Sequence, residues 1–126
     1  MAKILLVDDD VDFAAALARM LVHDGYVTSL ASDTATALRH LSGGAHEADL
    51  VIADLRLCRE SGLDLVAELR RRQPPLPVIL LSASPDASSY LEALRLGAYE
   101  YLAKPLDFTE LRQVLQRALS ACGRAA

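Results

Sequence analysis

The sequence contains few of the residues from which metal clusters, disulfide frameworks and histidine-based active sites are built. Of its 126 residues, only two are cysteine and three are histidine. Cys58 and Cys122 do not form the close pairs that zinc sites require, so we interpret them as free thiols of a protein in a reducing compartment. The histidines fit no ligand spacing and are not candidates for catalysis: His23, His40 and His46.

Long apolar runs and an excess of basic residues are also missing. No stretch reaches the roughly 18 apolar residues of a membrane-spanning helix, and nothing resembles a secretory signal. The net charge of -4 and the pI near 5.3 argue against nucleic acid or an anionic membrane as the partner of this domain. The composition is typical of one globular domain. We expect it to cover residues 1–121, with 122–126 as a C-terminal tail or the start of a linker.

What the sequence does contain is an alternation of two apolar patterns. Short continuous runs predict strands buried on both faces at 4–7, 50–53 and 78–81. Weaker segments predict strands nearer the sheet edges at 27–31 and 99–103. Apolar residues at helical spacing follow each strand, in stretches near 13–21, 35–41, 63–69, 88–96 and 107–119. Five strand–helix pairs with right-handed crossovers give a doubly wound α/β fold, a parallel sheet with helices on both faces.

Residues that start or stop helices flank these stretches. Glycine, serine or proline follows four of the helical stretches: Gly25, Ser42-Gly43-Gly44, Pro74-Pro75 and Gly97. The last helix begins with "DFTE", in which Asp107 and Glu110 resemble a capping box. These signals place the helix ends close to the limits of the apolar patterns.

Reactive side chains follow four of the five predicted strands. They are Asp8, Asp9 and Asp10 after the first, Asp54 after the third, Ser82 at the end of the fourth and Lys104 after the fifth. In doubly wound sheets, ligands bind at the carboxyl ends of the strands, beside the point where the strand order reverses. If the order is 2-1-3-4-5, the first and third strands are neighbours. The acids that follow them then converge.

This combination of acids, hydroxyl and amine is suited to phosphoryl chemistry. Two carboxylates about 4 Å apart repel by ~4 kcal/mol at an effective dielectric near 20, so a protein either protonates one or binds a cation. Mg²⁺ prefers oxygen ligands and is commonly held by carboxylates together with phosphate oxygens. A metal, an ammonium and a hydroxyl around one phosphoryl group would neutralise its equatorial oxygens. A carboxylate in the same place can be the covalent nucleophile and form an aspartyl phosphate.

The chain resembles the receiver domain of response regulators in two-component signalling. The similarity covers residues 3 to about 120 and consists of "ILLVDDD", "DLVIADLRLCRESGLDL", "VILLSAS" and "GAYEYLAKPLDFTEL", in the expected order and spacing. The resemblance implies a flavodoxin-like three-layer (βα)5 sandwich with strand order 2-1-3-4-5. It also implies that Asp54 is the phospho-acceptor and that Gly62 is the glycine expected downstream of it. Cys58 departs from the family, which usually has proline at this position.

The resemblance also assigns the metal ligands and the groups around the phosphoryl group. Asp9 would bind Mg²⁺ (or Mn²⁺) directly, together with Asp54 and the backbone carbonyl of Arg56, and Asp8 would act mainly through a metal-bound water. Ser82, Lys104 and the backbone N–H of Ala83 would contact the phosphoryl oxygens. Tyr101 would be an aromatic switch that turns inward when Ser82 is drawn to the phosphate. The Lys104-Pro105 bond would be cis, while Arg56 and Ser84 occupy variable positions that tune the lifetime of the phosphoryl group.

The function implied by the resemblance is a phosphorylation-controlled switch and not a metabolic enzyme. A sensor histidine kinase or a phosphotransfer protein would donate the phosphoryl group from a phosphohistidine. The domain would help to catalyse its own phosphorylation and dephosphorylation in the cytoplasm. The face formed by the fourth helix, fifth strand and fifth helix would then bind a partner, an output domain or a second copy in a homodimer.

The sequence also allows other functions, and it allows purely structural roles for some of these residues. A haloacid-dehalogenase-type phosphatase with Asp8 as nucleophile has a similar order of Asp, Ser and Lys, but it leaves Asp54 unexplained. A flavin-binding module would need a phosphate loop where the acids stand, and a receiver that is not phosphorylated would be expected to lack a site residue. Several residues have purely structural interpretations: Asp10 and Asp12 as caps or charges at a helix start, Tyr101 as an edge aromatic, and Arg70-Arg71-Arg72 as a solvated helix end.

Overall fold

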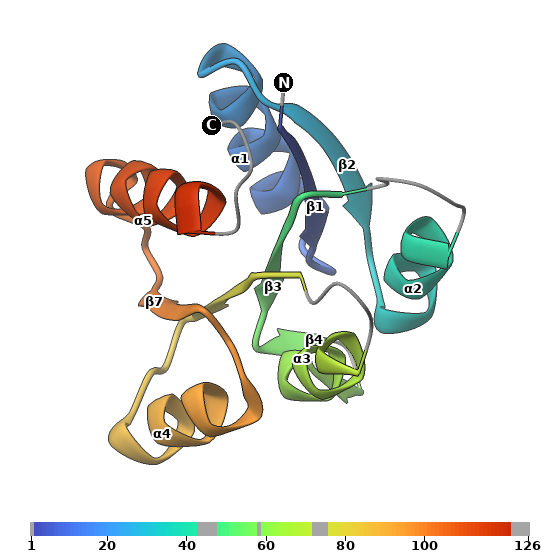
Figure 1. Cartoon of the computed structure of the whole chain (residues 1–126), viewed down its shortest axis with the longest axis vertical. Coiled ribbons are helices and arrows are strands. Elements are labelled where there is room, and N and C mark those ends of the chain that lie inside the picture. The colour runs from blue at the N-terminus through green and yellow to red at the C-terminus, as the bar shows by residue number, and fades with distance from the viewer. Residues whose placement is uncertain (1, 43–47, 58, 72–75, 122–126) are drawn as a thin grey trace.

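A computed structural model describes residues 2–42, 48–57, 59–71 and 76–121 of the chain (Figure 1). A parallel sheet forms its centre, with strands in the order β2-β1-β3-β6-β7. The strands are β1 (Lys3–Val7), β2 (Val27–Ala31), β3 (Leu50–Asp54), β6 (Val78–Ser82) and β7 (Glu100–Ala103). The helices are α1 (Val11–His23), α2 (Thr34–Ser42), α3 (Gly62–Arg70), α4 (Ala87–Leu96) and α5 (Phe108–Ala121). The predicted doubly wound α/β fold is confirmed. Because β6 and β7 are the fourth and fifth strands of this sheet along the chain, the predicted strand order 2-1-3-4-5 is confirmed as well.

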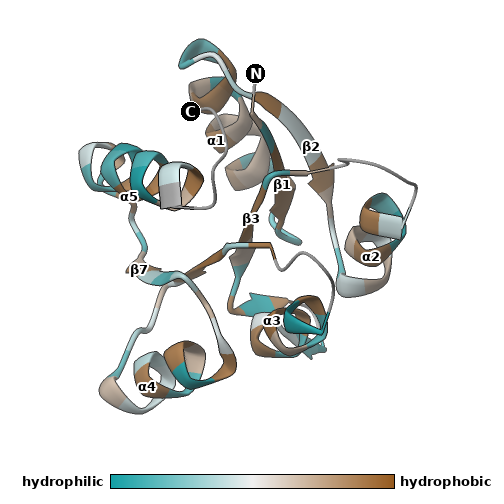
Figure 2. Ribbon diagram, in the orientation of Figure 1, coloured by the Kyte–Doolittle hydropathy of each residue, from teal (hydrophilic) through white to brown (hydrophobic). Residues whose placement is uncertain are grey.

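The strands divide the hydrophobic core into two layers because successive side chains point to opposite faces. On β1, Ile4 and Leu6 belong to the cluster that includes residues of α1 and α5. Leu5 and Val7 belong to the other cluster, with residues of α2, α3 and α4. Figure 2 shows the hydrophobic colour concentrated in the central strands. Burial on both faces explains why these strands are continuous apolar runs and not alternating ones.

The helix ends follow the predicted signals where the structure describes them. The carboxylate of Asp10 accepts a hydrogen bond from the Phe13 N–H and caps the start of α1. Gly25, with φ of 97°, follows the end of α1, and Gly97, with φ of 109°, caps α4. Both glycines adopt the left-handed conformation that other residues rarely enter. Asp107 accepts hydrogen bonds from the N–H groups of Thr109 and Glu110 at the start of α5.

The structure adds one element that the sequence patterns did not predict. A short antiparallel pair, β4 (Arg56–Leu57) and β5 (Glu60–Ser61), follows Asp54 and leads directly into α3. Strands of two residues are too short to show a hydrophobic period. Arg59 between them has a positive φ of 64°, a conformation common in tight turns.

Some sequence features lie outside the described residues. They are Cys58, Cys122, His46, Arg72, the Gly43-Gly44 and Pro74-Pro75 stops and the tail 122–126. No helix in the described ranges combines the length and the apolar character that crossing a membrane requires. The exposed side chains of Arg70 and Arg71 agree with the interpretation of a solvated helix end.

Candidate functional site

Three acidic side chains meet at the carboxyl ends of β1 and β3. The two strands are paired in parallel with Val7 opposite Ala53, so the residues that follow, Asp8 and Asp54, lie side by side. Asp8, Asp9 and Asp54 each place one carboxylate oxygen within 4.8 Å of the others. The predicted convergence of the acids is therefore a direct consequence of the strand order. Such a group of hard oxygen atoms fits the ligand preference of Mg²⁺.

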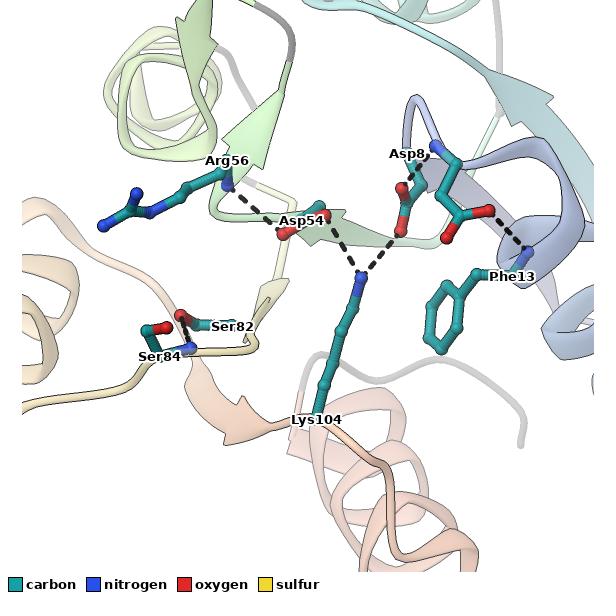
Figure 3. Close-up of polar contacts among 8 residues, drawn as sticks. Asp8, Phe13, Asp54, Arg56, Ser82, Ser84 and Lys104 are labelled. Carbon is teal, nitrogen blue, oxygen red and sulfur yellow. Dashed lines mark hydrogen bonds and ion pairs between the residues drawn. The ribbon is translucent and has the colours of Figure 1, made fainter.

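Lys104 reaches this acidic group from the end of β7, across β6. Its ammonium Nζ lies 3.2 Å from a carboxylate oxygen of Asp8 and 3.1 Å from one of Asp54, and its side chain points between the two acids in Figure 3. The side chains of Asp8, Asp54 and Lys104 are only 5%, 14% and 16% exposed. Because water screens them little, these ion pairs interact more strongly than pairs on the surface. The Lys104-Pro105 peptide bond is cis, as expected.

Burial and charge act in opposite directions on the ionisation of this group. Burial raises the pKa of Asp8 above its ordinary value, although the Asp10 N–H and Lys104 both favour the charged carboxylate. Burial alone would lower the pKa of Lys104, but its hydrogen bonds and charge interactions with Asp54 and Asp8 outweigh this effect and raise the pKa. The lysine therefore stays protonated, while the ionised form of Asp8 carries an energetic cost.

This cost predicts that Asp8→Asn stabilises the metal-free protein at pH 7. A folded-state pKa above the unfolded value gives stability that is fully present below the unfolded pKa and is lost as the pH rises through the folded pKa. Asparagine has no such ionisation and can still accept the Asp10 N–H. We therefore expect a higher Tm for Asp8→Asn in EDTA at pH 7 and a difference that shrinks as the pH falls. Thermal unfolding at several pH values measures it. A lower Tm for the variant at pH 7 would contradict the prediction.

Backbone groups hold the phospho-acceptor candidate Asp54 in place. One of its carboxylate oxygens accepts the Arg56 N–H at 3.2 Å, while the Arg56 side chain points away from it (Figure 3). The following chain returns close to Asp54, where the Gly62 N–H donates to the Leu55 carbonyl at 2.7 Å. A Cβ at position 62 would lie 2.4 Å from the carbonyl oxygen of Asp54. Only glycine allows this close approach of α3 to the strand end.

The side-chain hydroxyls of Ser82 and Tyr101 bond to residues other than the three acids and Lys104. The buried hydroxyl of Ser82 accepts a hydrogen bond from the Ser84 N–H at 3.1 Å. Tyr101 is 8% exposed, and its hydroxyl lies 2.7 Å from the Ser89 hydroxyl on α4. Ala83 is exposed in the loop that follows β6. The Ser82 carbonyl accepts the Lys104 N–H at 2.8 Å, which ties the end of β6 to the lysine. The predicted roles of Ser82, Ala83 and Tyr101 in phosphoryl binding and switching stay predictions.

Residues at the start of α1 lie beside the acidic group. Asp10, whose N–H donates to Asp8 at 2.8 Å, is the N-cap of α1, and Asp12 is in the first turn of the same helix. Both structural interpretations are confirmed. The sequence pattern indicates only that Phe13 is a core residue of a helix. In the structure, the centroid of its ring lies 4.1 Å from the ammonium of Lys104. No sequence signal identifies this contact, because it joins α1 to the end of β7.

Comparison with known proteins identifies the family. The family described as "Response regulator receiver domain" matches residues 4–116. The DNA-binding transcriptional regulator NtrC of Rhizobium meliloti is 36% identical over 119 residues, covering 94% of this chain and 24% of that protein. A response regulator receiver domain protein from Clostridium thermocellum has a TM-score of 0.90 at 29% identity, with 98% of both chains covered. A response regulator protein from Burkholderia pseudomallei, solved with a phosphorylated aspartic acid, a calcium ion and citrate, has a TM-score of 0.83 at 32% identity, covering 98% of this chain and 71% of that one.

These matches cover nearly the whole of this chain but only part of its curated relatives. The chain spans about a quarter of the length of the curated relatives it matches, between 24% and 26%. The alternative of a haloacid-dehalogenase-type phosphatase, with Asp8 as nucleophile, receives no support from them. The acids of β1 and β3, the lysine after β7 and the sheet that brings them together agree with the matched family. This chain belongs to the response regulator receiver domains of two-component signalling.

Proposed function

We propose that this receiver domain accepts a phosphoryl group on Asp54 from the phosphohistidine of a sensor histidine kinase or a phosphotransfer protein. The observation that carries the proposal is the position of the Asp54 carboxylate. It lies at a strand end between the Lys104 ammonium and the Arg56 N–H, next to two further acids. The similar protein from Burkholderia pseudomallei contains a phosphorylated aspartic acid and a calcium ion, which agrees with this chemistry.

The acids of the site are suited to a divalent cation. Receiver domains in general bind Mg²⁺ at an acidic pocket, and Asp8, Asp9 and Asp54 form such a group here. We propose that Asp9, Asp54 and the Arg56 carbonyl would hold Mg²⁺ (or Mn²⁺) directly and that Asp8 would act mainly through a metal-bound water. When bound, the cation supplies positive charge to the phosphoryl oxygens. It would also offset the burial and the repulsion from Asp54 that make an ionised Asp8 costly.

The transfer breaks one bond and forms one. A carboxylate oxygen of Asp54 attacks phosphorus in line with the phosphohistidine, the P–O bond forms, and the P–N bond breaks as the imidazole leaves with the electron pair. Lys104 would exchange its bond to the Asp54 carboxylate for one to a phosphoryl oxygen. The Ser82 hydroxyl and the Ala83 N–H would donate to the other oxygens. The domain would thereby help to catalyse its own phosphorylation, and with a water as nucleophile its dephosphorylation.

The movement of Ser82 would link phosphorylation to a surface of the protein. Its hydroxyl would leave the Ser84 N–H, which alters the loop between β6 and α4. Tyr101 on β7 would respond with α4, to which its hydroxyl is bonded through Ser89. The face built from α4, β7 and α5 carries exposed apolar residues of α4: Tyr90, Leu91 and Leu94. We propose that this face binds an output domain, a partner or a second copy of the chain.

The Ser89 contact predicts how firmly Tyr101 is held. We expect Ser89→Ala to remove the partner of the Tyr101 hydroxyl and to raise the population of other ring positions roughly fivefold, the equivalent of a typical hydrogen bond of about 1 kcal/mol. NMR of ring-labelled tyrosine measures the change. Ser88→Ala, an exposed neighbour on α4, is the matched control. An unchanged Tyr101 ring signal in Ser89→Ala would show that the hydroxyl pair does not hold the ring.

The experiment that tests the proposed function is phosphorylation with a defined donor. Purified protein is incubated with acetyl phosphate and Mg²⁺, and in parallel with a phosphorylated histidine kinase. The expected product is an acyl phosphate that is cleaved by base and by hydroxylamine, with one phosphoryl group per chain. It should be located at Asp54 by mass spectrometry of peptides after borohydride reduction. Labelling that persists at full rate in excess EDTA would contradict the metal requirement. A phosphoryl group found at another residue would contradict the acceptor assignment.

A further inference from the structure

One aromatic ring contacts the reactive lysine and has no part in the function proposed above. The Lys104 ammonium lies 4.1 Å from the centroid of the Phe13 ring, and Figure 3 shows the ring beside the end of the lysine side chain. We propose that Phe13 is a positioning residue that holds the Lys104 ammonium at the acidic site through a cation–π contact. The inference rests on the proposed function, because it concerns the lysine assigned there to the phosphoryl group.

A closed chain of contacts places the ring at this position. The Asp10 N–H donates to one carboxylate oxygen of Asp8 at 2.8 Å, and the Phe13 N–H donates to the Asp10 carboxylate at 3.1 Å. The other oxygen of Asp8 receives the Lys104 ammonium at 3.2 Å, which lies over the Phe13 ring. The third aspartate thus fixes the backbone of Phe13 in relation to Asp8. Because Phe13 lies in the first turn of α1, the capped start of this helix places its ring beside the lysine.

The surroundings favour a strong contact between the ring and the cation. The Lys104 side chain is 16% exposed, and Phe13 packs against the core cluster between the sheet, α1 and α5. The face of a phenylalanine ring carries negative charge density, which attracts an ammonium group more strongly when water is excluded. Since the ring is also restrained by the core, it offers the ammonium a fixed position. Phe13 therefore attracts and positions the ammonium more strongly than an aliphatic side chain of similar size would.

The ring would matter most when the carboxylates no longer attract the lysine. In the structure, Lys104 is held by Asp8 and Asp54. Both acids become weaker partners for it once a bound cation neutralises their charge. The attraction of the Phe13 ring does not depend on their ionisation. Phe13 would thus keep the ammonium within reach of the phosphoryl oxygens while its bond to Asp54 is exchanged, and this lowers the cost of orienting the lysine.

NMR of the metal-free protein tests the contact directly. A ring beneath the lysine shifts the protons of the Lys104 ε-methylene group upfield through its ring current. We expect this shift in the wild type and in Phe13→Tyr, and its loss in Phe13→Leu. An ordinary shift of these protons in the folded wild type would overturn the inference. This measurement needs no phosphorylation and is independent of the proposed function.

Fluorinated phenylalanine tests the positioning role with almost no change of shape. Phenylalanine with one, two or three fluorine atoms is introduced at position 13, and the rate of phosphorylation by acetyl phosphate is measured at saturating Mg²⁺. Fluorine withdraws charge from the ring face, so the rate should fall stepwise with each fluorine. The trifluorinated ring and Phe13→Leu should reach about threefold to tenfold below the wild type, as expected for a cation–π contact of ordinary strength. Phe13→Tyr, which keeps the ring face, should stay within about twofold of the wild type.

The chain supplies its own control, because it has two phenylalanines. Phe108 is in the first turn of α5 and is 44% exposed, and the same fluorination there should leave the rate unchanged. A rate that does not respond to fluorine at position 13 would overturn the inference even if Asp54 is the acceptor. Phosphorylation at a residue other than Asp54 would overturn the proposed function, while the ring-current shift would still report the contact.

Discussion

The Asp54→Asn protein is expected to take up no phosphoryl group from acetyl phosphate and Mg²⁺ under conditions that label the wild type fully. The amide of asparagine is a poor nucleophile and forms no acyl phosphate. Its oxygen can still accept a hydrogen bond from the Arg56 N–H or from Lys104, so the fold and the position of the lysine should be kept. The measurement is intact mass or radioactive labelling with time, together with a Tm for each protein.

Two further variants test whether the loss of labelling is specific to Asp54. Asp8→Asn removes an acid that is predicted to act through a metal-bound water, so it should label more slowly but still at Asp54. Asp64→Asn changes an exposed carboxylate in the first turn of α3 and should label at the rate of the wild type. Labelling that survives in Asp54→Asn would disprove the assignment of the acceptor. It would also reopen the question of whether another acid of the site, such as Asp8, is the nucleophile.

The Gly62→Ala variant is expected to lose both stability and phosphorylation. The added Cβ would lie 2.4 Å from the backbone carbonyl oxygen of Asp54 and 3.0 Å from a methyl carbon of Leu80, so the backbone has to move. Forced overpacking of this kind costs about 3 kcal/mol, which corresponds to a fall in Tm of roughly 10 °C for a domain of this size. The displaced strand end carries Asp54, and we therefore expect the rate of labelling by acetyl phosphate to fall at least about tenfold.

Gly25→Ala is the matched control for this substitution. Gly25 has a positive φ of 97°, and a Cβ there would meet no atom within 4 Å. Alanine should cost about 1 kcal/mol through backbone strain alone, and because Gly25 is at the far end of α1 from Asp8, labelling should be unchanged. The prediction would be wrong if Gly62→Ala were as stable as Gly25→Ala and were labelled as fast as the wild type. The close approach of α3 to Asp54 would then not be needed for phosphorylation.

The run "ILLVDDD" shows how local sequence and tertiary structure contribute to this site. Its apolar part is β1, which is buried on both faces, and its acids stand where that strand ends. Asp8 and Asp9 join Asp54 in the acidic group. Asp10 instead caps α1 and restrains Phe13. Three identical residues in a row therefore have different surroundings, because a strand end and a helix start face different groups.

The sequence determined the fold and the members of the site to a large extent. Buried parallel strands appear as continuous apolar runs, and amphipathic helices repeat at a period of 3.6 residues, so the elements and their order could be predicted from local patterns. The strand order 2-1-3-4-5, which the resemblance to receiver domains implied, then predicted the meeting of Asp8 with Asp54 and the approach of Lys104. These predictions succeeded because the carboxyl ends of parallel strands share one edge of the sheet.

Contacts between distant elements were decided only by the tertiary structure. The β4–β5 pair is too short for a sequence period, and Ser89 meets Tyr101 because α4 packs beside β7. Phe13 meets Lys104 because the start of α1 lies beside the end of β7. Side-chain direction and the packing angle of a helix are set by the whole core and not by a local pattern. The sequence by itself therefore determined which groups come together at the acidic edge, and the packing of the helices decided how the lysine among them is held.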